Sequence, residues 1–131
     1  MPEFNGFSHI AITVSDLERS KSWYMDVLGL QPVMDGVDEE SGIAYSVGFM
    51  SGGFALGLRQ HPGEGGTFTP DHLGLDHASF GVASRADLDA WESHLTEKGV
   101  TQSGIVEAPY GHVLSFKDPD NIALEAFFLS M

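Results

Sequence analysis

The chain has 131 residues, enough for one domain that buries about two thirds of the surface of its unfolded chain. Its formal net charge of −13, with Lys and Arg numbering 6, excludes nucleic acids and anionic membranes as partners. The lack of cysteine excludes disulfides, zinc–thiolate sites and thiol nucleophiles. No basic-then-apolar leader and no apolar run of membrane-spanning length occurs, which predicts a cytoplasmic location.

The first half begins with residues 7–14, whose alternating polar and apolar side chains predict a strand. Ser15 is predicted to cap the helix that follows, and Gly29 is predicted to end it in a left-handed conformation. Extended segments separated by Gly- and Asp-rich turns are then predicted at 30–34, 43–49 and 54–60.

The second half repeats this order from residues 75–82, which form another predicted strand. Ser84 is predicted to cap the next helix. Three further strands are predicted at 103–107, 112–117 and 122–128. Each half is therefore expected to be a β-α-β-β-β module, and the fold class is expected to be α+β.

An internal repeat supports this division. Shifting the sequence by 68 residues aligns His9 with His77. The same shift also aligns four further identical pairs within the predicted elements or at their ends: Val14 with Val82, Trp23 with Trp91, Ala55 with Ala123 and Leu56 with Leu124. Because they fall at equivalent places in the same order of elements, we interpret the halves as a duplication. The shift also aligns Glu125 with Gly57, so one half lacks a carboxylate that the other carries.

The alternation of side chains along strands predicts which of them share a face. Ile10 and Ile12 are expected to face the helix of their module, and His9 is expected to face the other way. A curved sheet built from both halves would bring His9, His77 and Glu125 into one cleft. Two imidazoles and one carboxylate suit Fe²⁺, Mn²⁺, Co²⁺, Ni²⁺ or Zn²⁺ and leave coordination positions for substrate. The alternative is a barrel whose mouth keeps polar residues without binding metal.

Three segments carry a resemblance to a known family: "FSHIAITVSDLERSKSWYMDVLGLQPV", "LDHASFGV" and "YGHVLSFKDPDNIALEAF". The chain resembles, over nearly its whole length, the vicinal oxygen chelate superfamily of glyoxalase I, extradiol dioxygenases, fosfomycin-resistance proteins and bleomycin-binding proteins. The resemblance implies a half-open barrel of two modules around a cleft and a divalent metal ion held by His9, His77 and Glu125. It also implies a homodimer. At Gly57 the chain departs from glyoxalase I, which has a second Glu ligand there.

Three more residues are candidates for the site. Arg59 shares the predicted face of Gly57, and we expect it to bind an anionic group of a substrate, with a salt bridge within an acidic protein as the alternative. Tyr110 and His112 precede the last hairpin and are expected to donate protons or hydrogen bonds near the metal. Turn and surface roles are the alternative for both.

The chain is expected to form a single domain over 1–131, with a first module at about 5–62, a linker at about 61–74 and a second module at about 73–131. The expected function is that of a metal-dependent enzyme, dioxygenase-like or lyase-like, that acts on a small oxygen-rich organic molecule. The alternative is a metal-free protein that binds and sequesters a small molecule of the antibiotic type. A thiol-transferring enzyme is disfavoured because the chain has few cations for an anionic cosubstrate.

Overall fold

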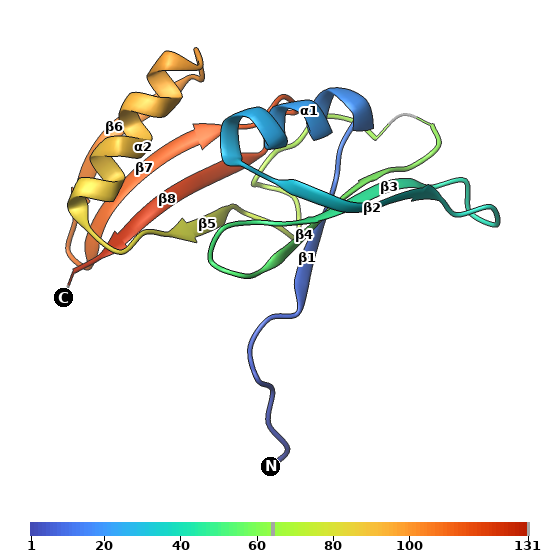
Figure 1. Ribbon diagram of the computed structural model, residues 1–131, viewed down its shortest axis with the longest axis horizontal. Helices are drawn as coiled ribbons and strands as arrows, with labels where there is room; N and C mark the ends of the chain where they lie inside the picture. Colours follow the sequence, from blue (N-terminus) through green and yellow to red (C-terminus); the bar gives the residue numbers. More distant parts are fainter. Residues whose placement is uncertain (64, 131) are drawn as a thin grey trace. The chain divides into compact units, whose positions relative to one another are not determined.

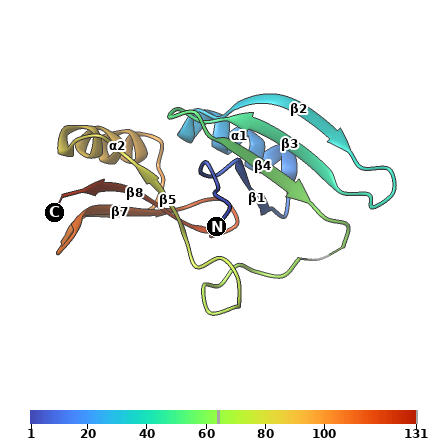
Figure 2. The ribbon, with the colours of Figure 1, turned by 90° about the horizontal axis from the view of Figure 1, so that it is seen from below.

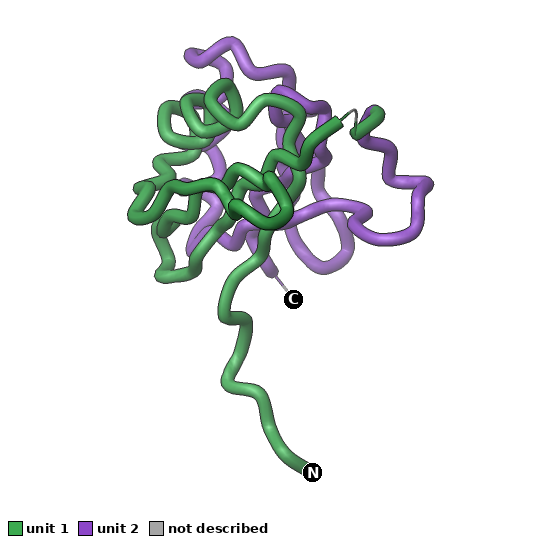
Figure 3. Tube along the Cα trace, turned by 90° about the vertical axis from the view of Figure 1, so that its right-hand side faces the viewer, with its two compact units in different colours: residues 1–66 green, residues 67–131 purple. Residues whose placement is uncertain are grey.

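The computed structural model of the protein describes residues 1–63 and 65–130. Residue 64 of the predicted linker and residue 131 at the end of the predicted second module lie outside the described residues. The chain divides into two compact units, Met1–Gly66 and Thr67–Met131 (Figure 3). Each unit contains one sheet and one helix.

The first unit has the predicted β-α-β-β-β order (Figure 1). Its elements are β1 (His9–Thr13), α1 (Leu17–Leu28), β2 (Gln31–Val37), β3 (Ala44–Phe49) and β4 (Ala55–Gln60). The strands form one sheet in the order β1-β4-β3-β2, in which β1 is parallel to β4 and the other pairs are antiparallel.

The second unit has the same order of elements. They are β5 (Ala78–Gly81), α2 (Arg85–Glu97), β6 (Gln102–Ala108), β7 (Gly111–Lys117) and β8 (Ala123–Leu129). The sheet order β5-β8-β7-β6 repeats that of the first unit, again with one parallel and two antiparallel pairs. The predicted α+β class with two β-α-β-β-β modules is confirmed. Among the described residues, no helix has the length and apolar character needed to cross a membrane.

The pairing of strands repeats residue by residue. In the first sheet Ala11 of β1 lies opposite Gly57 of β4. In the second sheet Ser79 of β5 lies opposite Glu125 of β8, and both residues are 68 positions after their counterparts. The predicted duplication is therefore present in the hydrogen-bonded register as well as in the sequence.

The helix caps differ from the prediction at one position. Asp16, and not Ser15, caps α1: its carboxylate accepts a hydrogen bond from the Arg19 backbone N–H at 3.1 Å. An aspartate at this position adds negative charge beside the positive end of the helix dipole, which favours it over the neutral serine. Gly29, with a φ of 75°, ends α1 as predicted. Ser84 caps the beginning of α2 as predicted.

One face of each sheet is buried beneath the helix of its own unit. Figure 2 shows α2 on one side of β7 and β8. The core on that side of the second unit consists of Leu88, Leu95, Leu114, Phe116, Leu124 and Ala126. In the first unit Ile12 is buried as predicted, whereas Ile10, at the beginning of β1, is 39% exposed. The opposite face of each sheet is left to carry the polar candidates.

Candidate functional site

Glu125 lies on the face of the second sheet opposite α2. Its neighbours along β8, Leu124 and Ala126, are buried in the core, so alternation points Glu125 away from it. Across the strands Glu125 pairs with Ser79 on one side and with Ser115 on the other, which gives a short polar row. The Glu125 side chain is 19% exposed. It is thus a largely covered carboxylate on a sheet face, a placement that requires polar or cationic partners.

His77 is the partner that the structure brings to Glu125. It lies immediately before β5, and its Nε2 atom is 3.6 Å from Oε1 of Glu125. Its other ring nitrogen, Nδ1, lies 2.7 Å from Oδ1 of Asp76. Because an ionised carboxylate only accepts hydrogen bonds, Nδ1 carries the proton and donates to Asp76. In neutral His77 the lone pair therefore lies on Nε2, the nitrogen that faces Glu125.

The same contacts raise the pKa of His77 above its usual value of 6.5. The hydrogen bond to Asp76 is the largest cause, partial burial opposes it, and the charges of Glu125 and Asp76 raise the pKa further. The imidazolium is thus favoured by folding. Its contribution to stability is fully present below the unfolded pKa of about 6.5 and is lost as the pH rises through the folded pKa.

We predict that NMR titration of the metal-free protein gives a midpoint for His77 above that of an ordinary histidine. Asp76→Asn should lower this midpoint more than Glu125→Gln does, because the Asp76 hydrogen bond is the larger cause. Asp71→Asn, which removes the same charge from an exposed position of the same unit, is the control and should leave the His77 midpoint unchanged. If Asp76→Asn left the titration midpoint of His77 unchanged, the hydrogen bond between Asp76 and His77 would be contradicted.

His9 occupies in the first unit the position that His77 occupies in the second. It begins β1, on the face opposite α1, and its Nδ1 lies 2.9 Å from Oγ of Ser8. The described residues contain no group of three or more His, Asp and Glu side chains that could hold a metal. What the structure brings together is the pair His77 and Glu125 of the second unit; His9 belongs to the first.

Gly57 stands where the repeat would place a second carboxylate. The residue is buried, and a Cβ atom built on it would lie 3.3 Å from Cβ of Ala11 on the neighbouring strand. Such a contact is tighter than most, so any side chain at this position requires β1 to yield slightly. The first sheet thus offers no acidic ligand at the position equivalent to Glu125.

Arg59 lies two residues beyond Gly57 on the same face of β4, as predicted. It pairs with Thr13 of β1 and Tyr45 of β3, so the three side chains form a row of hydrogen-bond donors across the first sheet. Nearby, the pKa of Asp38 is lowered, chiefly by the backbone N–H of Glu40 and least by the charge of Arg59. Arg59 therefore acts on Asp38 only as a minor electrostatic neighbour.

Tyr110 and His112 lie on different sides of the second sheet. The Tyr110 ring stacks on Phe127, with ring centres 5.7 Å apart, and Phe127 shares the face of Glu125. His112 pairs with Phe128, on the side covered by α2, and their rings stack at 6.1 Å. The structure therefore does not bring His112 to Glu125, because Phe128 lies three positions after Glu125 on β8 and so on the opposite face.

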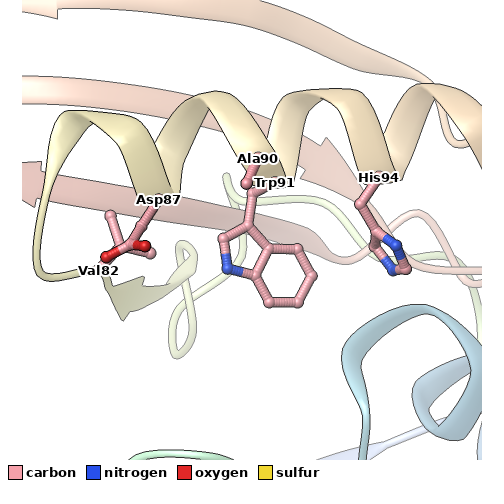
Figure 4. Close-up of a pocket in the computed structure, with 5 residues that line it drawn as sticks. All are labelled: Val82, Asp87, Ala90, Trp91 and His94. Carbon is pink, nitrogen blue, oxygen red and sulfur yellow. The ribbon is translucent and has the colours of Figure 1, made fainter.

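A pocket of about 400 Å³ lies along α2 and coincides with none of the predicted site residues (Figure 4). It is lined by Val82, Asp87, Ala90, Trp91 and His94. Trp91 and His94 meet edge to face at 5.3 Å.

Three polar neighbours of the candidates were not predicted from sequence: Ser8, Asp76 and Ser115. The repeat already pointed to two of them, because the 68-residue shift that aligns His9 with His77 also aligns Ser8 with Asp76. Ser115 becomes visible only through the register between β7 and β8.

The donors of the second unit fit a divalent metal ion. An imidazole Nε2 and a carboxylate oxygen face each other, and they are donor types that Mn²⁺, Fe²⁺ and Zn²⁺ accept. The contact from Nδ1 to a carboxylate is the arrangement that commonly orients metal-binding histidines.

Comparison with known proteins defines the class. Residues 6–126 match the model of the Glyoxalase/Bleomycin resistance protein/Dioxygenase superfamily, and the chain belongs to this family. It is 34% identical over 123 residues to the uncharacterized protein YwkD of Bacillus subtilis, covering 91% of this chain and 93% of YwkD. It is 25% identical over 131 residues to the putative ring-cleaving dioxygenase MhqA of the same organism, covering 93% of this chain but only 39% of MhqA.

Solved structures agree with this assignment. A glyoxylase/bleomycin resistance protein/dioxygenase domain from a Frankia species superposes with a TM-score of 0.90 and 36% identity, covering 98% of this chain and 100% of that one. The fosfomycin resistance protein FosX of Listeria monocytogenes, complexed with Mn(II) and a dihydroxypropylphosphonic acid, gives a TM-score of 0.71 at 17% identity over 95% and 93% of the chains. TnmS3, an antibiotic binding protein of a Streptomyces species, gives 0.76 at 20% identity over 99% and 100%. The last two similarities concern the fold.

Proposed function

We propose that the protein is a metal-dependent enzyme of this superfamily that acts on a small oxygen-rich organic molecule. The observation that carries the proposal is the pair His77 and Glu125, with Nε2 and Oε1 3.6 Å apart on the face opposite α2 and Nδ1 engaged by Asp76. His9 is proposed as the third ligand because it holds the position of His77 in the repeat. The metal, when bound, supplies Lewis-acid activation of substrate oxygen atoms.

The other residues have roles that their own chemistry supports. Glu125 supplies the negative charge that balances a cation, and Ser79 and Ser115 beside it can donate hydrogen bonds to its second oxygen. Tyr110, stacked on Phe127, presents a phenol hydroxyl that can donate a proton or a hydrogen bond to bound substrate. His112 is not part of the proposed site.

The reaction is proposed to be dioxygenase-like or lyase-like, with the former favoured. A three-ligand set without a carboxylate at Gly57 resembles that of extradiol dioxygenases and fosfomycin-type enzymes more than that of glyoxalase I. The relationship to MhqA, a putative ring-cleaving dioxygenase, supports the same direction. The small-molecule substrate and the homodimer stay predictions.

Arg59→Ala should weaken the binding of an anionic substrate analogue, such as an aromatic carboxylate, by about 10- to 100-fold, because it removes a charge-assisted hydrogen bond. The metal content should not change, since Arg59 is not among the proposed ligands. Calorimetric titration of the metal-loaded protein measures the affinity for the analogue, and elemental analysis measures the metal content. Arg85→Ala, which removes a cation that pairs with Asp89 on α2, is the control. Equal affinity in the Arg59 and Arg85 variants would make Arg59 a structural residue.

The proposal is tested by elemental analysis of protein purified without chelators and without a His-tag. The protein is analysed again after loading with Fe²⁺, Mn²⁺, Co²⁺, Zn²⁺ or Ni²⁺ and removal of excess metal. About one ion per chain is expected, together with an increase in thermal stability on loading. Catechols and α-hydroxycarbonyl compounds are then the first substrates to screen. If the protein retains none of these ions and is stabilised by none of them, the proposal is rejected.

A second candidate function is the metal-free binding of a small molecule. It is favoured by the apolar row Ala11, Gly57, Val47 and Met34 across the first sheet, and by the fold similarity to the antibiotic binding protein TnmS3. A binding protein has no need for a polar row around Glu125 and a histidine oriented toward it, which is why the enzyme is preferred. Ligand binding unaffected by metal or by chelator would support the binding protein.

A further inference from the structure

The two candidate histidines are held by different kinds of neighbour. In both units the residue just before the histidine contacts Nδ1: Asp76 contacts His77 at 2.7 Å, and Ser8 contacts His9 at 2.9 Å. The carboxylate of Asp76 can only accept, so it admits one neutral tautomer of His77. The hydroxyl of Ser8 can donate or accept, so it admits both tautomers of His9.

This difference has a direct consequence for metal binding. A metal binds the unprotonated nitrogen of a neutral imidazole. For His77 that nitrogen is always Nε2, which faces Glu125 at 3.6 Å. For His9 the contact with Ser8 allows both tautomers of the neutral ring, and only one of them leaves Nε2 unprotonated. A carboxylate on Nδ1 also makes the ring a stronger donor than a hydroxyl does.

We propose that Asp76 is a positioning residue that fixes the tautomer of His77, and that His77 and Glu125 are therefore the first ligands to capture a divalent cation, with His9 as the weaker third ligand. The order of ligands rests on the proposed function, whereas the tautomer does not.

The contacts of Asp76 argue against a structural role. Its side chain is 73% exposed, and within the described part of the chain its carboxylate contacts only the His77 ring. Neither residue belongs to the buried core of the second unit. Replacing the carboxylate of Asp76 should therefore leave the fold intact and change the imidazole alone.

The first measurement is the tautomer of each histidine in the metal-free protein. Long-range ¹H–¹⁵N NMR at about pH 9, well above the ordinary imidazole pKa of about 6.5, distinguishes a protonated Nδ1 from a protonated Nε2. His77 is expected to be protonated at Nδ1, and His9 is expected to show both tautomers. Asp76→Asn should give His77 both tautomers, because an amide can donate or accept. Ser8→Asp should confine the neutral ring of His9 to the tautomer that is protonated at Nδ1. If His77 of the unmodified protein showed both tautomers, the inference would be overturned.

The second measurement is the affinity for Mn²⁺ and Zn²⁺ by calorimetry. Asp76→Asn is expected to weaken binding by about 10- to 100-fold, and Asp71→Asn, which removes the same charge from an exposed position of the same unit, is expected to leave it unchanged. His9→Ala should still take up one ion per chain at high metal concentration, whereas His77→Ala should take up none. The inference would be overturned if His77→Ala took up one ion and His9→Ala none, or if Asp76→Asn bound metal with unchanged affinity. Either result would leave the proposed function standing.

The two failures are distinguishable. Absence of metal from the unmodified protein would reject the proposed function and with it the order of the ligands. The NMR result would then decide alone whether Asp76 positions His77.

Discussion

Glu125→Gln is expected to lower the affinity for a divalent metal by more than about 100-fold, because it removes the carboxylate from the proposed ligand set. The amide oxygen carries no negative charge to balance the cation. The substitution keeps the size of the side chain, and β8 keeps its pairing to β5 and β7. The free energy of unfolding of the metal-free protein should therefore change little, while the stabilisation by added metal disappears.

The control for this prediction is Glu107→Gln on β6. Glu107 is an exposed carboxylate of the same unit, and it pairs with His112, whose ring lies on the side of the sheet covered by α2. Calorimetric titration with Mn²⁺ and thermal unfolding with and without metal compare the two variants. If both bind metal as the unmodified protein does, Glu125 is not a ligand and the proposed site is rejected.

Gly111→Ala is expected to destabilise the protein by about 3 kcal/mol or more. Gly111 has a φ of 155°, which side chains rarely adopt, and a Cβ atom there would overlap the backbone carbonyl oxygen of Phe128. It would also lie 3.1 Å from the ring of Phe127. Since neither backbone can move without breaking the pairing of β7 with β8, the strain has no easy relief.

Gly81→Ala is the matched control for Gly111→Ala. Gly81 ends β5 in the same sheet, and a Cβ atom there meets no atom within 4 Å. Denaturant unfolding of the two variants should give a large loss for Gly111→Ala and a change within about 0.5 kcal/mol for Gly81→Ala. Equal stabilities would show that the hairpin at Gly111 can rearrange.

The structure places His112 on the face of the second sheet opposite Glu125. The nearness of His112 to Tyr110 in the chain suggested a shared role, but two residues that flank the start of a strand need not share a face. The turn sends Tyr110 onto Phe127, on the face of Glu125. His112 follows the buried Gly111 and joins the face of Leu114 and Phe116.

The amino-acid sequence by itself determined the order of the elements and the duplication, and it predicted one cleft for His77, Glu125 and His9. These depend on local periodicity and on an internal repeat, and both can be recognised in the amino-acid sequence alone. Only the tertiary structure decided the contact of Asp76 with Nδ1, the serines beside Glu125 and the face of His112. These depend on the register between strands and on the rotamers of neighbouring side chains, which are set by packing across the sheet.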